Sequence, residues 1–234
     1  MLKEKINHIF FDLDNTLWDH RKNARLALKK LFDNHSLADK LNVDFQGFYK
    51  CYYNSNESLW DKLRDGKIDK TYLRKHRFYD VFIDFGFNDF ELSQTFEEQF
   101  LETIIEFNEL IPDAREILQY LSEKDYVIHI VSNGFQEVTY RKIEGGALGA
   151  YFTTVTSADE VGVRKPNPEI FQYAVDIADA KVEESIFIGD DWIADALGAR
   201  DFGMKSVFLD LFNQNPYAEG VLTIKELKEI KQIL

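Results

Sequence analysis

Three features of the sequence predict an α/β protein with a parallel sheet that carries helices on both faces. Four apolar runs have the length of buried strands, and amphipathic helical patterns lie between the later ones. The third feature is a helical block of about 90 residues directly after the first run. Parallel strands need crossover connections, which are usually helices, so alternating strands and helices indicate this fold class.

The expected strands are short apolar runs. The first covers residues 5–11 and contains the segment "IFF". The other three cover residues 126–132, 185–190 and 205–210. Their near-continuous apolar character is typical of strands that are buried on both faces of a sheet, which fits the parallel arrangement.

Helical spacing of apolar residues marks two segments that precede or separate these strands. Residues 113–123 place their apolar side chains three and four positions apart, as one face of a helix requires. Residues 167–178 show the same spacing, with Asn167 as the expected N-cap and Pro168 at the first helical position. Both residue types favour these positions, because an asparagine side chain can accept an orphan backbone N–H and proline has none to satisfy.

The end of the chain predicts a last helix. Residues 223–234 begin with Thr223, and Glu226 follows three positions later. This spacing is the pattern of a capping box, in which each of the two side chains accepts the backbone N–H of the other residue. We therefore expect the last helix to begin at Thr223.

Residues 18–107 break the alternation of strands and helices. The segment contains amphipathic helical stretches and no convincing β pattern. It is therefore expected to form a separate helical domain, while residues 1–17 and 108–234 form the α/β core domain. Most of its aromatic side chains are expected to form its own core. They include Trp18, Tyr49, Tyr52, Tyr53, Trp60, Tyr72, Phe78 and Tyr79.

Composition limits the expected partners and compartment. The formal net charge is −13, and such a charge repels phosphate backbones and anionic lipid, so we expect neither nucleic-acid polymers nor membranes as partners. Cys51 is the only cysteine, which excludes an intrachain disulfide and a cysteine metal cluster. No apolar run has the length of a signal segment or a membrane span. The expected location is the cytoplasm.

Polar residues gather where three of the expected strands end. Ligands of open parallel sheets bind beyond the carboxyl ends of the strands, so these residues are expected to converge on one site. A single pair of aspartates is a weak signal, whereas three polar strand ends in one chain are much harder to reach by chance. The residues are Asp12 and Asp14 after the first strand, Ser132, Asn133 and Gly134 after the second, and Asp190 and Asp191 after the third.

The clustered carboxylates predict a cation site. Asp12, Asp14 and Asp190 offer hard oxygen ligands, which suit Mg²⁺. A calcium-binding EF-hand loop is the alternative for "DLDNT", but its sixth position would be Leu17 in place of glycine and its twelfth Asn23 in place of glutamate. Mg²⁺ would also supply the local positive charge that an acidic protein needs to hold a phosphate.

A lysine completes the set of polar residues. Lys165 precedes Pro166, which biases it toward an extended conformation. Several of these residues also have ordinary structural explanations, and the sequence alone leaves them open. Lys165 could be a solvated loop residue, Asp14 a turn carboxylate, and Asp191 and Asp195 could stabilise the first turn of a helix.

Four motifs in fixed order make the chain resemble the phosphatases of the haloacid dehalogenase (HAD) superfamily. "FFDLDNTL" is similar to the first motif, "IVSNG" to the second, "VRKPNP" to the lysine motif and "IGDDWIAD" to the fourth, across residues 9–195. The resemblance implies a Rossmann-like core domain. It also implies that the helical insertion is a type-one cap domain.

The resemblance implies a role for the acidic residues. Asp12 would be the nucleophile that forms an aspartyl-phosphate, and Asp14 would be the general acid and then the base. Asp12 and Asp190 would hold Mg²⁺, together with the backbone carbonyl of Asp14.

The remaining motif residues would bind phosphate or support the site. Ser132, the N–H of Asn133 and Lys165 would hold the phosphoryl oxygens, and Lys165 would also screen Asp12. Thr16 is expected to support the first loop. Asp191 and Asp195 are expected to orient Lys165 or metal-bound water.

Asp14 indicates which chemistry the site performs. The dehalogenases of this superfamily break a carbon–halogen bond and typically lack an aspartate two positions after the nucleophile, so "DLD" favours hydrolysis of a phosphate ester. The segments "EVGVRKPNPEIF" and "GDDWIADALGA" are most similar to bacterial pyrimidine 5′-nucleotidases. The expected partner is a small phosphorylated metabolite, and the expected state is a monomer or homodimer. Arg74 and Arg77 either face the site or are solvated.

Three alternatives to a nucleotidase stay open at this stage. The first is a superfamily phosphatase acting on a sugar phosphate or phosphoglycolate. The second is a phosphomutase. The third, from another class, is a receiver-like signalling module, which also forms an aspartyl-phosphate but stores it and normally has no insertion after its first strand.

Overall fold

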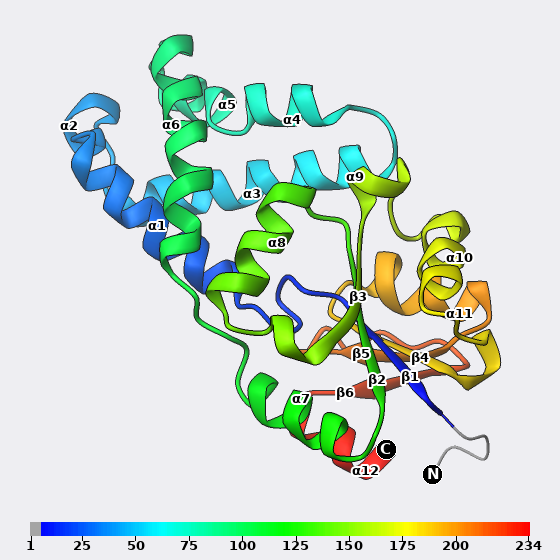
Figure 1. Cartoon of the computed structure of the whole chain (residues 1–234). Helices are drawn as coiled ribbons and strands as arrows, with labels where there is room; N and C mark the ends of the chain where they lie inside the picture. Colours follow the sequence, from blue (N-terminus) through cyan, green and yellow to red (C-terminus); the bar gives the residue numbers. More distant parts are fainter. Residues whose placement is uncertain (1–5) are drawn as a thin grey trace. The chain divides into compact units, whose positions relative to one another are not determined.

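A computed structural model describes residues 6–234, which divide into two compact units (Figure 1). The sheet unit holds the chain up to His20 together with Asn108–Leu234. The helical unit is Arg21–Phe107. The chain thus leaves the sheet unit once, shortly after the first strand, and returns once.

The sheet unit is built on six parallel strands in the order β3-β2-β1-β4-β5-β6. Four of them confirm the strands expected from the sequence, although residue 5 of the first lies outside the described residues. The strands are β1 (His8–Phe11), β2 (Val127–Ser132), β3 (Phe152–Ser157), β4 (Ser185–Gly189), β5 (Lys205–Leu209) and β6 (Val221–Ile224).

Strands β3 and β6 were not expected. They form the two edges of the sheet, where one side of the strand has no neighbour. Accordingly, β3 reads "FTTVTS" and β6 reads "VLTI", and each exposes part of its length. Neither has the continuous apolar run that reveals a central strand.

Register brings the three polar strand ends to one edge of the sheet. Phe11 of β1 pairs with Ile130 of β2 on one side and with Ile188 of β4 on the other. Asp12 is therefore one residue beyond this level, and Ser132 and Asp190 are each two residues beyond it. The convergence expected from the sequence follows directly from this alignment.

Helices cover both faces of the sheet, as expected. Figure 1 shows α10 beside α11 in one group and α7 beside α12 in another. A core of buried residues that includes Phe10, Phe171 and Phe187 lies between the sheet and α10. The helical segments are α7 (Ala114–Glu123), α8 (Gln136–Gly145), η2 (Gly149–Tyr151), α9 (Ala158–Val161), α10 (Pro168–Ile177), η3 (Val182–Glu184), the π-helical η4 (Trp192–Leu197), α11 (Gly198–Phe202), η5 (Leu227–Glu229) and α12 (Ile230–Ile233).

The capping predictions have two outcomes. Asn167 caps α10 as expected, accepting a hydrogen bond from the Glu169 N–H at 2.9 Å. The prediction of a helix that begins at Thr223 was wrong, because Thr223 lies in β6 and pairs with β5. The capping box is formed by Glu226 and Glu229 instead, and it starts the short segments η5 and α12.

The helical unit contains only helices within residues 21–107, which confirms the helical character expected of the insertion. Aspartates cap three of these helices, and aromatic side chains such as Phe48, Phe78 and Phe96 are fully buried between them. The elements are α1 (His20–Asn34), α2 (Leu37–Leu41), α3 (Phe45–Arg64), α4 (Lys70–His76), α5 (Tyr79–Asp84), α6 (Phe90–Thr103) and η1 (Ile104–Glu106).

Helices α1 and α3 are joined by three stacked cation–π contacts. Residues four positions apart on one helix face residues four positions apart on the other, so the contacts repeat once per turn. The pairs are Arg21 with Tyr53 and Arg25 with Tyr49, both at 5.2 Å, and Lys29 with Phe45 at 5.7 Å. Part of the aromatic content of the insertion thus packs under basic side chains rather than in its core. No helix in the described part of the chain has the length and apolar character to cross a membrane.

Candidate active site

Lys165 lies at the centre of the polar cluster at the strand ends. Its side chain is 1% exposed. The Nζ atom lies 2.7 Å from each of three oxygens, namely Asp12 Oδ1, the Val131 carbonyl and Asp195 Oδ1. A buried ammonium with three close oxygen partners is fully compensated, so Lys165 is not a solvated loop residue.

Asn133 fixes the backbone on either side of the Lys165 side chain. Its Nδ2 donates to the Lys165 carbonyl at 3.0 Å, and its Oδ1 accepts from the Lys165 N–H at 2.8 Å. The peptide bond between Lys165 and Pro166 is cis. The asparagine side chain therefore holds the lysine segment against the end of β2, a contact that the sequence analysis did not foresee.

Asp191 and Asp195 have different contacts. Asp191 Oδ1 accepts hydrogen bonds from the N–H groups of Ile193 and Ala194, at 2.9 and 2.8 Å, and so caps the helical turn. Asp195 contacts Lys165 and accepts from the Asp191 N–H at 3.0 Å. The two aspartates therefore differ in what they contact. Asp191 caps the helical turn, and Asp195 is the partner of Lys165.

Gly189 makes the position of Asp195 possible. A Cβ atom at residue 189 would lie 2.2 Å from Asp195 Oδ2, far closer than any real contact. The absence of a side chain at the end of β4 is therefore what allows the Asp195 carboxylate to approach the sheet.

Three carboxylates surround a small volume beside Lys165. One oxygen each of Asp12, Asp190 and Asp195 can be chosen so that all lie within 4.8 Å of one another. Thr16 Oγ1 donates to Asp190 Oδ1 at 3.3 Å. Lys165 balances one of the three negative charges, so two remain when all four groups are ionised. A divalent cation matches both the donor set and this charge.

Burial raises the pKa of the three clustered carboxyls. For Asp12, burial and the charges of Asp195 and Asp14 raise the pKa, and Lys165 opposes the rise. For Asp190, burial and the charge of Asp12 raise the pKa well above its usual value. Burial also raises the pKa of Asp195. Burial alone would lower the pKa of Lys165, but the two adjacent carboxylates outweigh it and raise that pKa. The lysine is therefore charged. A further positive charge nearby would lower the raised pKa values of the three carboxyls.

Asp14 has a different environment from Asp12. Its Oδ1 accepts from Lys142 Nζ at 2.6 Å, and His20 Nδ1 lies 3.7 Å away. Burial would raise the pKa of Asp14, but the charges of Lys142 and His20 outweigh it and lower the pKa. The two aspartates of the first motif are thus set apart electrostatically, as groups with different tasks often are.

Lys142 is a site residue that the sequence analysis missed. It lies on α8 and is 4% exposed, and its Nζ is 4.7 Å from the centre of the Trp18 ring. A signal existed, because Lys142 is four positions after the buried Val138 and therefore on the buried face of the helix. Its partner is 128 positions away in the chain, and no local pattern could identify it.

Ser132 Oγ and Asp14 Oδ2 both lie near Gly134. The Gly134 N–H donates to Ser132 Oγ at 3.0 Å. A Cβ atom at residue 134 would lie 3.1 Å from Ser132 Oγ and 3.5 Å from Asp14 Oδ2. Lys165 contacts Asp12, Asn133 and Asp195, and Thr16 contacts Asp190. Residues of all four motifs are thus linked at this end of the sheet.

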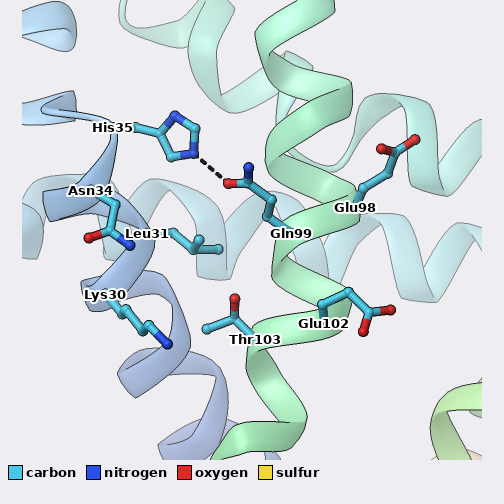
Figure 2. A pocket seen from close by; sticks show the side chains of 8 residues that line it. All are labelled: Lys30, Leu31, Asn34, His35, Glu98, Gln99, Glu102 and Thr103. Carbon is cyan, nitrogen blue, oxygen red and sulfur yellow. Dashed lines mark hydrogen bonds between the residues drawn. The ribbon is translucent and has the colours of Figure 1, made fainter.

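A separate pocket lies in the helical unit, between α1 and α6 (Figure 2). It has a volume of about 540 Å³ and is lined by side chains of both charges, including Lys30, His35, Glu98 and Glu102. His35 and Gln99 form a hydrogen bond of 2.6 Å across it. Its lining has the mixed character of a solvated helix face and contains none of the motif residues.

Comparisons with known sequences agree with the motif assignment. A family model described as "haloacid dehalogenase-like hydrolase" matches residues 6–203. The chain is 30% identical to a glyceraldehyde 3-phosphate phosphatase of Pyrococcus furiosus, with 98% of this chain and 92% of the relative covered. It is 28% identical to the pyrimidine 5′-nucleotidase YjjG of Escherichia coli, with 98% of both covered.

Solved structures share the fold. The HAD-hydrolase YfnB of Bacillus subtilis, in a crystal structure bound to magnesium, has a TM-score of 0.88 at 23% identity and covers 99% of each chain. An L-2-haloacid dehalogenase of Xanthobacter autotrophicus has a TM-score of 0.73 at 17% identity, with 97% of this chain and 98% of that chain covered. At such identities the likeness shows the fold alone. From the family match over most of its length, the chain belongs to the haloacid dehalogenase-like hydrolases.

Proposed function

We propose that the protein is a Mg²⁺-dependent phosphatase that hydrolyses a small phosphate monoester through an aspartyl-phosphate on Asp12. One observation carries this proposal: Asp12 lies in a buried cluster with Asp190, Asp195 and Lys165, while Asp14 lies outside this cluster and contacts a different cation, Lys142. A nucleophile beside a cation site and a second carboxyl that carries protons are the two groups that this reaction needs.

The donor set fits a magnesium ion. Asp12 and Asp190 would hold it, with the Asp14 carbonyl as a further ligand, while Asp195 stays on Lys165. The ion, when bound, supplies the positive charge that lowers repulsion between the carboxylates and an incoming phosphate. The magnesium-bound relative supports this choice of metal.

The first chemical step forms the covalent intermediate. Asp12 Oδ1 accepts a hydrogen bond from Lys165 Nζ, which leaves Oδ2 to attack phosphorus. The Oδ2–P bond forms as the bond from phosphorus to the leaving oxygen breaks, and Asp14 gives that oxygen a proton. Lys165 and Ser132 would hold the phosphoryl oxygens.

The second step regenerates the enzyme. Asp14, now without its proton, removes a proton from water, whose oxygen attacks phosphorus. The bond from phosphorus to Asp12 breaks, and inorganic phosphate leaves. Asp14 thereby regains the proton that it gave away, so the cycle balances.

Asp14 also favours phosphate chemistry over dehalogenation, although a dehalogenase shares the fold. A halide leaves without a proton, so dehalogenation has no use for an acid at this position. The contact of Asp14 with Lys142 and the closeness of its Oδ2 to Gly134 support a role for Asp14 in the site and argue against a solvated turn.

We propose a pyrimidine nucleoside 5′-monophosphate as the substrate. The nucleotidase relative, which aligns over nearly the full length of both chains, supports this class. A second candidate is a small sugar or triose phosphate, which the glyceraldehyde 3-phosphate phosphatase relative favours. In either case the partner is a small phosphorylated metabolite.

Phosphate release from a panel of metabolites with Mg²⁺ tests the proposal. We expect dUMP, dTMP and UMP to exceed glyceraldehyde 3-phosphate, sugar phosphates and phosphoglycolate, with reversible loss of activity in EDTA. The Asp12→Asn and Asp14→Asn variants should each lose nearly all turnover on the best substrate. Repeated turnover distinguishes a hydrolase from a receiver-like module, and the absence of a bisphosphate requirement distinguishes it from a phosphomutase.

Preference for a sugar phosphate or phosphoglycolate would refute the nucleotidase assignment while leaving the phosphatase intact. Turnover like that of the wild type in either aspartate variant would refute the mechanism.

A further inference from the structure

Lys142 is buried in a place where packing alone does not require a charge. It lies on the inner face of α8, between Val138 and Ile143, which are both buried. An apolar side chain would suit such a position, because burying an ammonium is costly unless it is paired. The described contacts of its Nζ atom are Asp14 Oδ1 at 2.6 Å and the face of Trp18 at 4.7 Å. The lysine is therefore directed at one atom of the site.

The contacts of Asp14 divide its two oxygens. Oδ1 is taken by Lys142 and lies 3.7 Å from His20 Nδ1. Oδ2 lies on the other side, close to where a Cβ of Gly134 would be, and that same position is 3.1 Å from Ser132 Oγ. The bond to Oδ1 thus turns Oδ2 toward the end of β2, where Ser132 would bind the phosphoryl group.

The surroundings hold Lys142 in this position. Trp18, on which the ammonium stacks, is fully buried and its Nε1 donates to Asn108 Oδ1 at 3.4 Å. The Asn108 side chain in turn lies against Gly145 at the end of α8, where a Cβ would be 2.5 Å from Asn108 Oδ1. Helix α8, the tryptophan and the first-motif loop are therefore fixed to one another at this point.

We infer that Lys142 is a positioning residue that orients the Asp14 carboxylate, so that Oδ2 faces the oxygen that accepts its proton. This inference rests on the proposed phosphatase function and goes beyond it, since the motifs assign no role to Lys142. Lys142 acts through Asp14 and not on the substrate. Its loss should therefore reduce proton transfer to the leaving oxygen more than it reduces substrate binding.

The test compares leaving groups that need a proton with leaving groups that do not. Wild type, Lys142→Met and Lys142→Arg are assayed with Mg²⁺ on alkyl phosphates and on p-nitrophenyl phosphate, whose leaving group departs as a stable anion. For Lys142→Met we expect kcat/KM to fall by about 30-fold or more on alkyl phosphates and by less than about fivefold on p-nitrophenyl phosphate, since general acid catalysis contributes about 10²–10⁴-fold. KM should stay within about threefold. Lys142→Arg, which can donate to the same oxygen, should recover most of the loss.

The ratio between the two substrates keeps the test valid if a variant folds poorly, because both rates scale with the amount of folded enzyme. Arg141→Met removes a positive charge from the adjacent position of the same helix and serves as the control, with an unchanged ratio expected. In the Asp14→Asn background, Lys142→Met should have little further effect on the ratio, because the two residues act as a unit.

Equal losses on both kinds of substrate, or the same ratio as the wild type, would overturn the positioning role and leave the phosphatase assignment standing. An Asp14→Asn variant with no leaving-group dependence of its own would instead overturn the proton-carrier role of Asp14 and the inference with it. A wild type without turnover on any phosphate monoester would overturn both.

Discussion

The two units each bury a cluster of opposite charges, and the clusters differ in how closely the charges meet. In the sheet unit, Lys165 lies 2.7 Å from both Asp12 and Asp195. In the helical unit, Glu97 lies 3.6 Å from Arg77 Nε and 3.7 Å from Arg74 Nε. Glu97 and Arg77 are nearly as buried as Lys165. The two clusters are therefore buried to a similar degree, but their charged atoms lie closer together in the sheet unit.

Several buried polar atoms of the helical unit also lack hydrogen-bond partners. Among the described residues, neither Glu97 oxygen has a hydrogen-bond partner, and the same holds for Arg77 Nε, Tyr52 Oη and Asn56 Oδ1. Such atoms normally bind ordered water when they are buried. Arg77 is thus not solvated in the way a surface arginine is, contrary to one of the two alternatives that the sequence left open.

The difference shows what a close-packed ion cluster contributes. Around Lys165 the three oxygen partners all lie 2.7 Å from one nitrogen, although Asp195 Oδ1 makes an ion pair with it and no hydrogen bond. Such close placement is the requirement for catalysis by orientation. Around Glu97 the charged atoms lie 3.6 and 3.7 Å apart, too far for hydrogen bonds. Their attraction favours the packing of α4 against α6 but does not fix the position of each atom. Substitutions in the two clusters should therefore differ in the size of their effects.

The largest effect should come from removing the buried ammonium of the sheet unit. Lys165→Met leaves Asp12 and Asp195 buried without their partner, so the metal-free protein should lose about 3 kcal/mol of unfolding free energy. Turnover should fall by at least about 10³-fold, because the variant also lacks a group proposed to hold the phosphoryl oxygens. Denaturant titration and phosphate release measure the two effects.

The matched change in the helical unit is Arg77→Met. Its cost should be smaller, because Arg77 Nε lies 3.6 Å from Glu97 Oε2, whereas Lys165 Nζ lies 2.7 Å from both of its carboxylate partners. A larger stability loss for Arg77→Met than for Lys165→Met would reverse the comparison drawn between the clusters.

An effect of opposite sign is expected for Asp190→Asn. Burial and the Asp12 charge raise the pKa of Asp190, so replacing this carboxylate by a neutral amide should stabilise the metal-free protein by about 1–2 kcal/mol. The same variant should no longer gain thermal stability when Mg²⁺ is added, because it has lost a proposed ligand. Thermal melts with and without Mg²⁺ measure both changes, and Asp191→Asn is the control for an adjacent carboxylate. Metal-induced stabilisation equal to that of the wild type would contradict Asp190 as a ligand.

The smallest effect concerns the pH dependence of the helical unit. Burial raises the pKa of Glu97 above its usual value, and Arg77 and Arg74 only partly oppose the rise. The folded state therefore keeps this proton to a higher pH than the unfolded state, so the unfolding free energy should decrease as pH rises through the interval between the two pKa values. Over this interval, Glu97→Gln should remove about 1 kcal/mol or less of the decrease in unfolding free energy. Denaturant titrations from pH 4.5 to 7 compare the variant with the wild type, and identical slopes would show that Glu97 does not titrate in this range.

The sequence predicted what local pattern and strand order determine. The central strands, the capped helix at Asn167 and the convergence of Asp12, Ser132 and Asp190 all follow from apolar runs and from the geometry of parallel sheets. The edge strands were missed because exposure on one side dilutes their apolar pattern. Thr223 was assigned to a helix for a similar reason, since its pairing with β5 is invisible in the local sequence.

Contacts between residues far apart in the chain could not be predicted from the sequence. Lys142 and Asp14 are 128 positions apart, and Asn133 and Lys165 are 32 apart. Each contact depends on the path of the whole chain between its members. The split between Asp191 and Asp195 likewise needed coordinates, because both suit a helix N-terminus equally well in sequence.

The missing side chain at Gly189 has a consequence for which residues related sequences can carry at this position. The volume that a methyl group would fill is already taken by Asp195, so even alanine, the smallest replacement, would displace the partner of Lys165. One added methyl group at residue 189 should therefore disrupt the cluster around Lys165. Related chains should keep glycine at this position as strictly as they keep the first aspartate of the first motif.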